Sequence, residues 1–238
     1  MKNQYVSLAL IGLLTVAVTG CQKGASAPAE SASAPAPSAL NCAVAATIDD
    51  VEDNDGQIAT SDGRGGYIYT YADETGTTIA PGTAGFSATA GGAENSGYAM
   101  HIAGKLAASG EIYAGVGFNF TESDSPYNAS VYRSISFYAK VGDGTSPHVR
   151  LQVADVNTDP KGGICSECYN DFGAPLILTT EWKKYTVPFA DLKQETGWGK
   201  PTPSAVETSK LIGVKWQVAT PGAEYDLWID NVQLEGCL

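Results

Sequence analysis

Short apolar stretches with a two-residue period run through most of the chain, and they constrain its fold more than any other feature. In the segments 112–120, 147–154 and 211–218, large apolar side chains alternate with glycine or polar ones. Alternate side chains of a β-strand point to opposite faces of a sheet, so each segment predicts a strand with one buried face. Clusters of Gly, Asp, Asn, Pro and Ser separate the stretches, as is typical of turns.

About ten strands are expected from this pattern. They lie near 46–51, 66–71, 97–103, 112–120, 134–140, 147–154, 175–179, 182–189, 211–218 and 224–234. The sequence shows no long amphipathic helix, and residues 188–194 fit one helical turn at most. We therefore expect an all-β domain, a two-sheet β-sandwich of the jelly-roll kind.

The N-terminus has the features of an export signal. Lys2 precedes an almost unbroken apolar run over residues 6–18, which is too short to cross a hydrocarbon core of ~30 Å. The small residues before Cys21 resemble the lipobox of bacterial lipoproteins, which implies removal of residues 1–20 and lipidation of Cys21. The alternative is an ordinary signal peptide that is cleaved nearby, with an incidental cysteine.

The segment after the signal is expected to be a tether. Residues 24–40 are nearly all Ala, Ser and Pro, and they offer too little apolar surface to offset the entropy of ordering. We expect a disordered linker over 21–41 and one folded domain over 42–238. The protein would then be exported and held by its lipid anchor alone. Gln22 resembles the residue that follows the cysteine in outer-membrane lipoproteins, so a periplasmic or cell-surface location on that membrane is expected.

The cysteines agree with an exported domain. The chain has five, and four remain if Cys21 is lipidated, an even number that is typical of two disulfides. The economical pairing joins Cys165 to Cys168, which only Ser-Glu separates, and Cys42 to Cys237 at the two ends of the domain. A redox or zinc role for the C-x-x-C motif would need a strand-to-helix setting or a second close ligand pair, and neither is visible.

The charge balance disfavours several partners. The chain has 14 Lys and Arg against 26 Asp and Glu, for a net charge of −12. Without a basic stripe, nucleic acid and anionic polysaccharides are poor candidates. Neutral glycans, cations and proteins remain.

Three segments bracket and divide the expected domain: the acidic start 48–53, the middle stretch 182–192 and the end 225–234. In this order they resemble the galactose-binding-like jelly rolls, and especially the family 11 carbohydrate-binding modules, over about residues 46–236. The resemblance implies a non-catalytic module that binds β-glucan-like chains in a concave cleft, with a structural calcium ion elsewhere. The insertion around the C-x-x-C motif departs from the family pattern.

The acidic start is a candidate metal site. Five carboxylates lie within residues 49–55, and Ca²⁺ takes about six to eight oxygen ligands, many of them from carboxylates. In the resembled modules the ion ties the first strand to the last, which implies Glu52 and Asp230 as ligands, with Asp50 as a third candidate. The alternative is a solvated acidic edge that discourages pairing with another strand.

Recognition of a neutral sugar needs an aromatic ring against its apolar face and planar polar groups for its hydroxyls. Tyr67, Tyr69 and Tyr71 alternate along one expected strand and so share a face. That face is either a stacking platform or ordinary core. Tyr69 and Tyr71, which are nearer the following turn, are the better candidates for exposure.

Polar side chains on other strands supply the second requirement. Arg150 and Gln152 point away from an apolar face and continue into Asp155, and Gln217 belongs to a similar outward row. The resembled modules use an Arg and an Asp on a central strand, which favours the Arg150 row for the cleft; the alternative is a solvated convex face. Two further candidates are Asn119, in a glycine-rich strand, and Trp198, in a loop, as a rim residue or a cap on the core.

Three functions fit this sequence. The expected one is a membrane-tethered, non-catalytic module that binds a neutral, β-glucan-like polysaccharide, with envelope or secreted hydrolases as partners. The second is a structural or protein-interaction lipoprotein on the same fold, with the tyrosines buried. The third is a polysaccharide hydrolase or lyase, which two histidines and an acidic chain do not favour, although paired carboxylates could be assembled from its many acidic residues.

Overall fold

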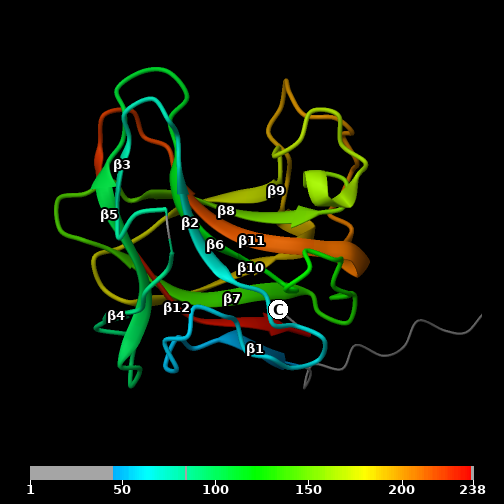
Figure 1. The fold of residues 1–238 in the computed structure, drawn as a ribbon, viewed down its shortest axis with the longest axis horizontal. Coiled ribbons are helices and arrows are strands. Elements are labelled where there is room, and N and C mark those ends of the chain that lie inside the picture. Colours follow the sequence, from blue (N-terminus) through cyan, green and yellow to red (C-terminus); the bar gives the residue numbers. More distant parts are fainter. Residues whose placement is uncertain (1–44, 84, 237–238) are drawn as a thin grey trace, which may run out of the picture. The chain divides into compact units, whose positions relative to one another are not determined.

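The computed structural model describes residues 45–83 and 85–236 (Figure 1). The signal segment, the linker, Cys21 and the expected pair Cys42–Cys237 lie outside the described residues. The short helices of the described ranges lack the length and apolarity needed to cross a membrane.

The described chain forms two antiparallel sheets. The seven-stranded sheet contains β1 (Ala45–Asp49), β3 (Thr78–Ala80), β4 (Thr89–Ala90), β5 (Tyr98–Lys105), β7 (Ser134–Val141), β10 (Lys183–Pro188) and β12 (Glu224–Glu235). The five-stranded sheet contains β2 (Ile68–Ala72), β6 (Ala114–Asn119), β8 (His148–Asp155), β9 (Phe172–Ile177) and β11 (Leu211–Val218). Three short 3-10 helices are η1 (Pro160–Gly162), η2 (Phe189–Asp191) and η3 (Thr208–Lys210).

The sheets pack face to face, as Figure 1 shows. The seven-stranded sheet has the order β10-β7-β12-β5-β3, with β1 on β12 and β4 on β5, and the other has the order β2-β6-β11-β8-β9. After β5 the chain changes sheet at every step except from β8 to β9. This path through two antiparallel sheets confirms the predicted β-sandwich of the jelly-roll kind.

The core lies between the two sheets. Trp216 of β11 is fully buried and packs edge-on against Phe137 of the opposite sheet, with ring centroids 5.1 Å apart. Phe118 of β6 lies 6.1 Å from the same indole. The large apolar side chains of the period-two stretches therefore fill the sandwich, and the alternate positions of the same strands face outward.

All ten expected strands are present, several within one or two residues of the expected bounds. The turn expected within 188–194 is η2. Two further strands, β3 and β4, were not expected, because strands of three and two residues are too short to show a period.

Candidate functional site

The three tyrosines of the β2 region lie on the outer face of the five-stranded sheet. Ile68 and Thr70 are buried toward the core, so Tyr69 and Tyr71 point the other way. The expectation that these two would be the most exposed is wrong, because Tyr67 is 55% exposed while they are partly covered. Tyr71 is covered because its ring lies over Gly115 of the neighbouring strand.

Strand register builds a floor from this face. One cross-strand row runs through Tyr71, Gly115, Gln217, Arg150 and Pro175, and the next through Tyr69, Gly117, Lys215, Gln152 and Gly173. We call these ten positions the cleft floor. Five strands at a spacing of ~4.8 Å give the floor a length of roughly 19 Å, enough for a short oligosaccharide.

Glycines let long side chains lie flat on the floor. A Cβ at Gly115 would overlap the phenol of Tyr71, and one at Gly173 would lie 2.7 Å from Nε of Arg150. The Tyr71 ring and the Arg150 side chain therefore occupy the space that a side chain at each glycine would fill. The floor presents ring and guanidinium surfaces instead of a row of upright side chains.

Aromatic rings gather at the β2 end of the floor. Tyr71 lies between Tyr69 and Tyr113, with ring centroids 6.1 Å from each, and its hydroxyl donates to Oε1 of Gln217 at 3.4 Å. Burial raises the pKa of Tyr69 and that of Tyr71 above the ordinary value. Both phenols consequently stay protonated and can donate a hydrogen bond at any physiological pH.

The charges of the floor are paired. Arg150 donates from Nη2 to the carbonyl of Lys193 at 2.7 Å, and its Nε lies 3.8 Å from Oε1 of Glu195. Lys215 forms an ion pair with Asp171, whose side chain is fully buried. Two cations thus face two carboxylates, so the floor has little net charge.

Two buried acceptors in or next to the floor have no hydrogen-bond partner among the described residues: Oε1 of Gln152, a floor residue 7% exposed, and Oδ1 of Asp171. A buried polar atom without a partner costs about 1–3 kcal/mol. Gln152 is the cross-strand neighbour of Lys215, and Asp171 forms the ion pair with Lys215.

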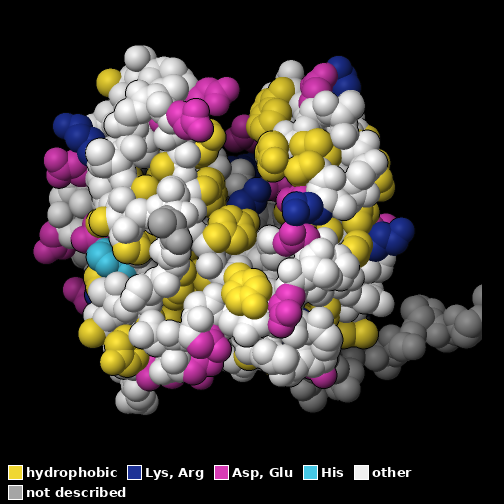
Figure 2. Space-filling view, viewed as in Figure 1, with side chains coloured by type: hydrophobic (Ala, Val, Ile, Leu, Met, Phe, Trp, Pro, Cys, Tyr) yellow, Lys and Arg dark blue, Asp and Glu magenta, His cyan; other side chains and the backbone are white. Residues whose placement is uncertain are grey.

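The surface above β8 and β11 is hollowed between two lobes, and hydrophobic, basic and acidic side chains gather along the hollow (Figure 2). We call this hollow the cleft. Tyr113 lies just before β6, where that strand begins. Residues 156–171 connect β8 to β9 at the opposite end of the strands, because β8 runs parallel to β6. The cleft therefore runs across the strands, along the rows of the floor.

The other sequence candidates lie in different settings. Nδ2 of Asn119 donates to Asp124 at the edge of the floor. Trp198, in the loop between η2 and η3, is 44% exposed, and its indole N–H donates to Glu195 at 3.3 Å. Asp155 is fully buried, because the alternation of β8 turns this position toward the interior. Its carboxylate accepts hydrogen bonds from the backbone N–H groups of Asn157 and Glu207. Its carboxylate is thus committed within the protein.

With this geometry established, solved structures provide a comparison. The family 11 carbohydrate-binding module from Clostridium thermocellum, in complex with a β-1,3-1,4-mixed-linked tetrasaccharide, matches with a TM-score of 0.57 and 16% identity over 82% of this chain and 96% of the module. The family 11 module of the cellulase Lic26A-Cel5E matches with the same TM-score, 0.57, at 15% identity over 82% and 96%. The family 30 module of Cel9D-Cel44B, also from C. thermocellum, gives a TM-score of 0.51 at 10% identity over 75% and 95%.

The chain has the fold of these carbohydrate-binding modules. The resemblance noted in the sequence is therefore confirmed at the level of the fold. No protein-family model and no curated protein matches the sequence.

The expected disulfide between Cys165 and Cys168 is present, with the Cα atoms 5.2 Å apart. It lies in the same connection as Tyr169, which follows it directly and is 60% exposed. Sequence reasoning missed Tyr113, Tyr169 and Asp171 as site residues. The last two belong to a connection with no strand periodicity, and their one signal was proximity to the C-x-x-C motif.

The metal candidates lie at the other sheet, around the loop 92–97. Glu52 accepts from the hydroxyl of Ser96 at 2.6 Å and from two backbone N–H groups of that loop, all at Oε1. Asp230 is fully buried and accepts from Ala93 N at 2.7 Å. Burial raises the pKa of Asp230, and the nearby Glu52 charge adds to this rise.

Glu52 borders a pocket, whereas Asp230 lies behind its lining: the lining residues are Asp50, Glu52, Ala93, Glu94, Asn95, Ser96 and Asn231. No Lys, Arg or His of the described chain forms an ion pair with Glu52 or Asp230. The described residues also contain no ready-made group of three or more His, Cys, Asp or Glu arranged as a metal site.

Proposed function

We propose that this domain is a non-catalytic carbohydrate-binding module that takes a neutral, β-glucan-like polysaccharide along the cleft. The observation that carries the proposal is the composition of the cleft floor. It combines partly covered tyrosine rings, planar polar side chains and paired charges on one face of a sheet.

Each part of the floor matches a part of a glycan. The rings of Tyr69 and Tyr71 offer flat apolar surface for the C–H face of a pyranose. Arg150, Gln152 and Gln217 offer planar donors and acceptors for vicinal hydroxyls. A neutral ligand suits a floor whose cations are already paired with carboxylates, because it leaves those pairs intact.

The comparisons support a glucan as the first ligand to test. The family 11 module that shares this fold is described in complex with a β-1,3-1,4-mixed-linked tetrasaccharide. A binding role is proposed over hydrolysis because two carboxylates near the floor hold cations of the protein, Asp171 that of Lys215 and Glu195 that of Arg150.

Two further parts of the proposal concern the ends of the domain. A structural Ca²⁺ would be held by Glu52 and Asp230, with Asp50 as a third ligand, and would fasten the first strand region to β12 beside the loop 92–97. A lipid on Cys21 would hold the protein at a bacterial outer membrane, with residues 21–41 as the tether. There the module would gather substrate for envelope or secreted hydrolases.

The test is binding to a panel of soluble polysaccharides, including mixed-linkage β-glucan and β-mannan, by affinity electrophoresis. We expect retardation on a neutral glucan, and its loss in Tyr71→Ala and in Arg150→Ala. Glu74→Gln, a change in an exposed turn outside the floor, serves as the control and should bind like the wild type. A folded, oxidised protein that binds no glycan would contradict the proposal and direct attention to protein partners.

A further inference from the structure

The connection that carries the disulfide is tied to a second loop in one compact unit, which we call the disulfide lobe (residues 156–171 and 193–203). Ser166 N donates to the carbonyl of Lys200 at 3.0 Å, and Lys200 N donates back to Glu167 at 3.1 Å. The side chains of Glu167 and Lys200 form an ion pair over these bonds. The two loops of the lobe are therefore joined by backbone pairing and an ion pair, and Cys165–Cys168 closes a short turn within the first loop.

Asn170 fastens the two loops from the inside. It is buried, its Nδ2 donates to the carbonyls of Glu195 at 2.9 Å and Trp198 at 2.6 Å, and its Oδ1 accepts from Glu195 N at 2.9 Å. The next residue, Asp171, reaches the floor and pairs with Lys215. These three hydrogen bonds of the Asn170 side chain hold the lobe in place above the floor.

Tyr169 stands between these fixed points and the disulfide, yet its own ring is largely free. The side chain is 60% exposed, and the backbone has φ of +74°, a left-handed conformation that a tyrosine rarely adopts. Its ring centre lies 5.8 Å from Nζ of Lys215, in the middle of the floor. Strained backbone that presents an exposed aromatic side chain is a feature of ligand clamps.

The topology places this ring opposite the other tyrosines. Tyr113 precedes β6, and Tyr169 precedes β9; β6 and β8 run in the same direction on either side of β11, and β9 begins where β8 ends. The two tyrosines consequently lie at opposite ends of the strands. A sugar on the floor at Lys215 and Gln152 would lie between the rings of Tyr71 and Tyr113 on one side and Tyr169 on the other.

We propose that Tyr169 is a specificity-determining stacking residue that grips a pyranose from the second wall of the cleft, and that the Cys165–Cys168 disulfide positions it. This inference rests on the proposed function. It assigns a ligand contact to the segment that departs from the family pattern, and it makes glycan affinity depend on the oxidation state of the disulfide.

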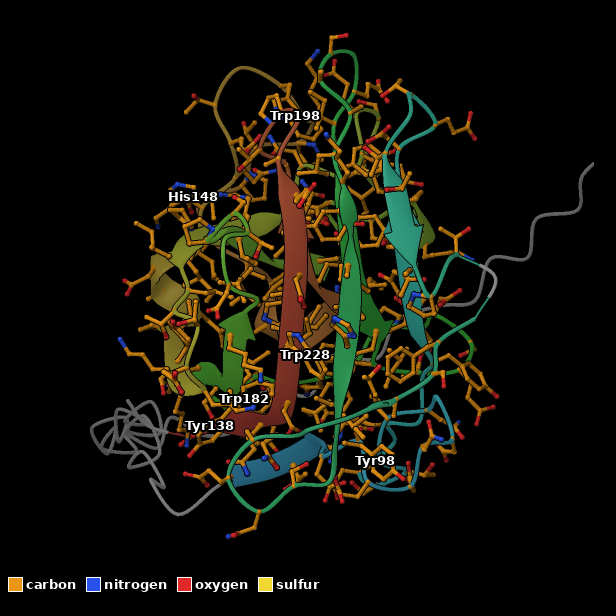
Figure 3. The ribbon with its side chains drawn as sticks, turned by 90° about the vertical axis from the view of Figure 1, so that its left-hand side faces the viewer. Tyr98, Tyr138, His148, Trp182, Trp198 and Trp228 are labelled. Carbon is orange, nitrogen blue, oxygen red and sulfur yellow. A yellow bond between two sulfur atoms is a disulfide. The ribbon has the colours of Figure 1, made fainter. Side chains whose placement is uncertain are left out.

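The test is isothermal titration of the full chain with the mixed-linkage β-1,3-1,4-glucan tetrasaccharide. We expect Tyr169→Ala to bind about tenfold more weakly, as for an aromatic contact in a binding site, and Tyr169→Phe to keep near wild-type affinity because the ring remains. Tyr98→Ala is the matched control, since Tyr98 is 40% exposed but belongs to the seven-stranded sheet (Figure 3).

A double-mutant cycle separates positioning from general stability. The pair Cys165→Ser with Cys168→Ser should weaken binding in the wild-type background and have no further effect in the Tyr169→Ala background. Equal losses in both backgrounds would show that the disulfide does not act through Tyr169. Wild-type affinity in Tyr169→Ala, with Tyr71→Ala weakened, would overturn the Tyr169 assignment alone, whereas a wild type that binds no glycan would overturn the proposed function as well.

Discussion

Asp73 connects the stability of the domain to the shape of its cleft, and its replacement gives a prediction whose size follows from the contacts. Its Oδ1 accepts from Thr75 N at 2.8 Å and from the Thr75 hydroxyl at 2.7 Å. Its Oδ2 accepts from the Thr77 hydroxyl and from Tyr113 N at 2.9 Å. Through Tyr113, which packs on Tyr71, this carboxylate holds one wall of the cleft.

We expect Asp73→Asn to lower the free energy of unfolding by about 2–3 kcal/mol at pH 7. An amide that keeps its oxygen on the Thr75 donors must turn its NH₂ toward Tyr113 N–H, so a donor then faces a donor. The hydroxyl of Thr77 can rotate, and thus the main loss is at Tyr113. The same displacement of Tyr113 should weaken glycan binding.

The dependence on pH has a definite sign. Burial opposes ionisation of Asp73, but the hydrogen bonds from Thr77, Tyr113 and Thr75 outweigh it and hold the pKa well below the ordinary value. A carboxyl whose pKa is lower in the folded state stabilises above its unfolded pKa, about 3.9, and loses this contribution as the pH falls below that value. The difference between wild type and Asp73→Asn should therefore be constant from pH 5 to 8 and shrink in acid.

Urea denaturation at a series of pH values, followed by tryptophan fluorescence, measures this difference. Glu74→Gln is the control, because Glu74 is the exposed neighbour of Asp73. The reasoning fails if Asp73→Asn is as stable as the control at pH 7, or if the difference grows in acid.

Three other predictions concern separate parts of the domain. Trp228→Ala should lower the free energy of unfolding by about 3 kcal/mol and leave glycan affinity unchanged. On the seven-stranded sheet (Figure 3), the Trp228 ring stacks on His101, with ring centroids 3.8 Å apart, and its centroid lies 4.9 Å from Lys140 Nζ. Thermal unfolding tests the first statement and titration the second. Gly115→Ala should weaken binding and lower stability, since the added Cβ would overlap the Tyr71 ring and lie 2.7 Å from the Trp216 carbonyl oxygen; an unchanged dissociation constant would contradict it. A chelator should lower the melting temperature of the wild type but not that of Glu52→Gln, and equal shifts in both would argue against the proposed Ca²⁺.

The period-two pattern made the sandwich and much of the floor predictable. It set which side chains of β2, β8 and β11 share a face, and hence brought Tyr71, Arg150 and Gln217 together across strands that are distant in sequence. It could not rank exposure, because a tyrosine that lies flat over a glycine is covered by the sheet.

The lobe beyond the floor was not predictable in the same way. Tyr169 and Asp171 reach the cleft through a long connection that has no period, and their positions depend on the disulfide and on bonds to residues 193–203. Asp155 shows the complementary failure: its place at the end of the strand that carries Arg150 and Gln152 suggests an outward side chain, but strand alternation turns it inward, where it is buried.

The most direct measurement is a crystal structure of the protein with the mixed-linkage tetrasaccharide. The account predicts sugar density along the cleft floor, with one pyranose over Tyr71 and its hydroxyls in contact with Arg150 and Gln217. Sugar density elsewhere, for example on the seven-stranded sheet beside Trp228 and Trp182, with an empty floor, would contradict it.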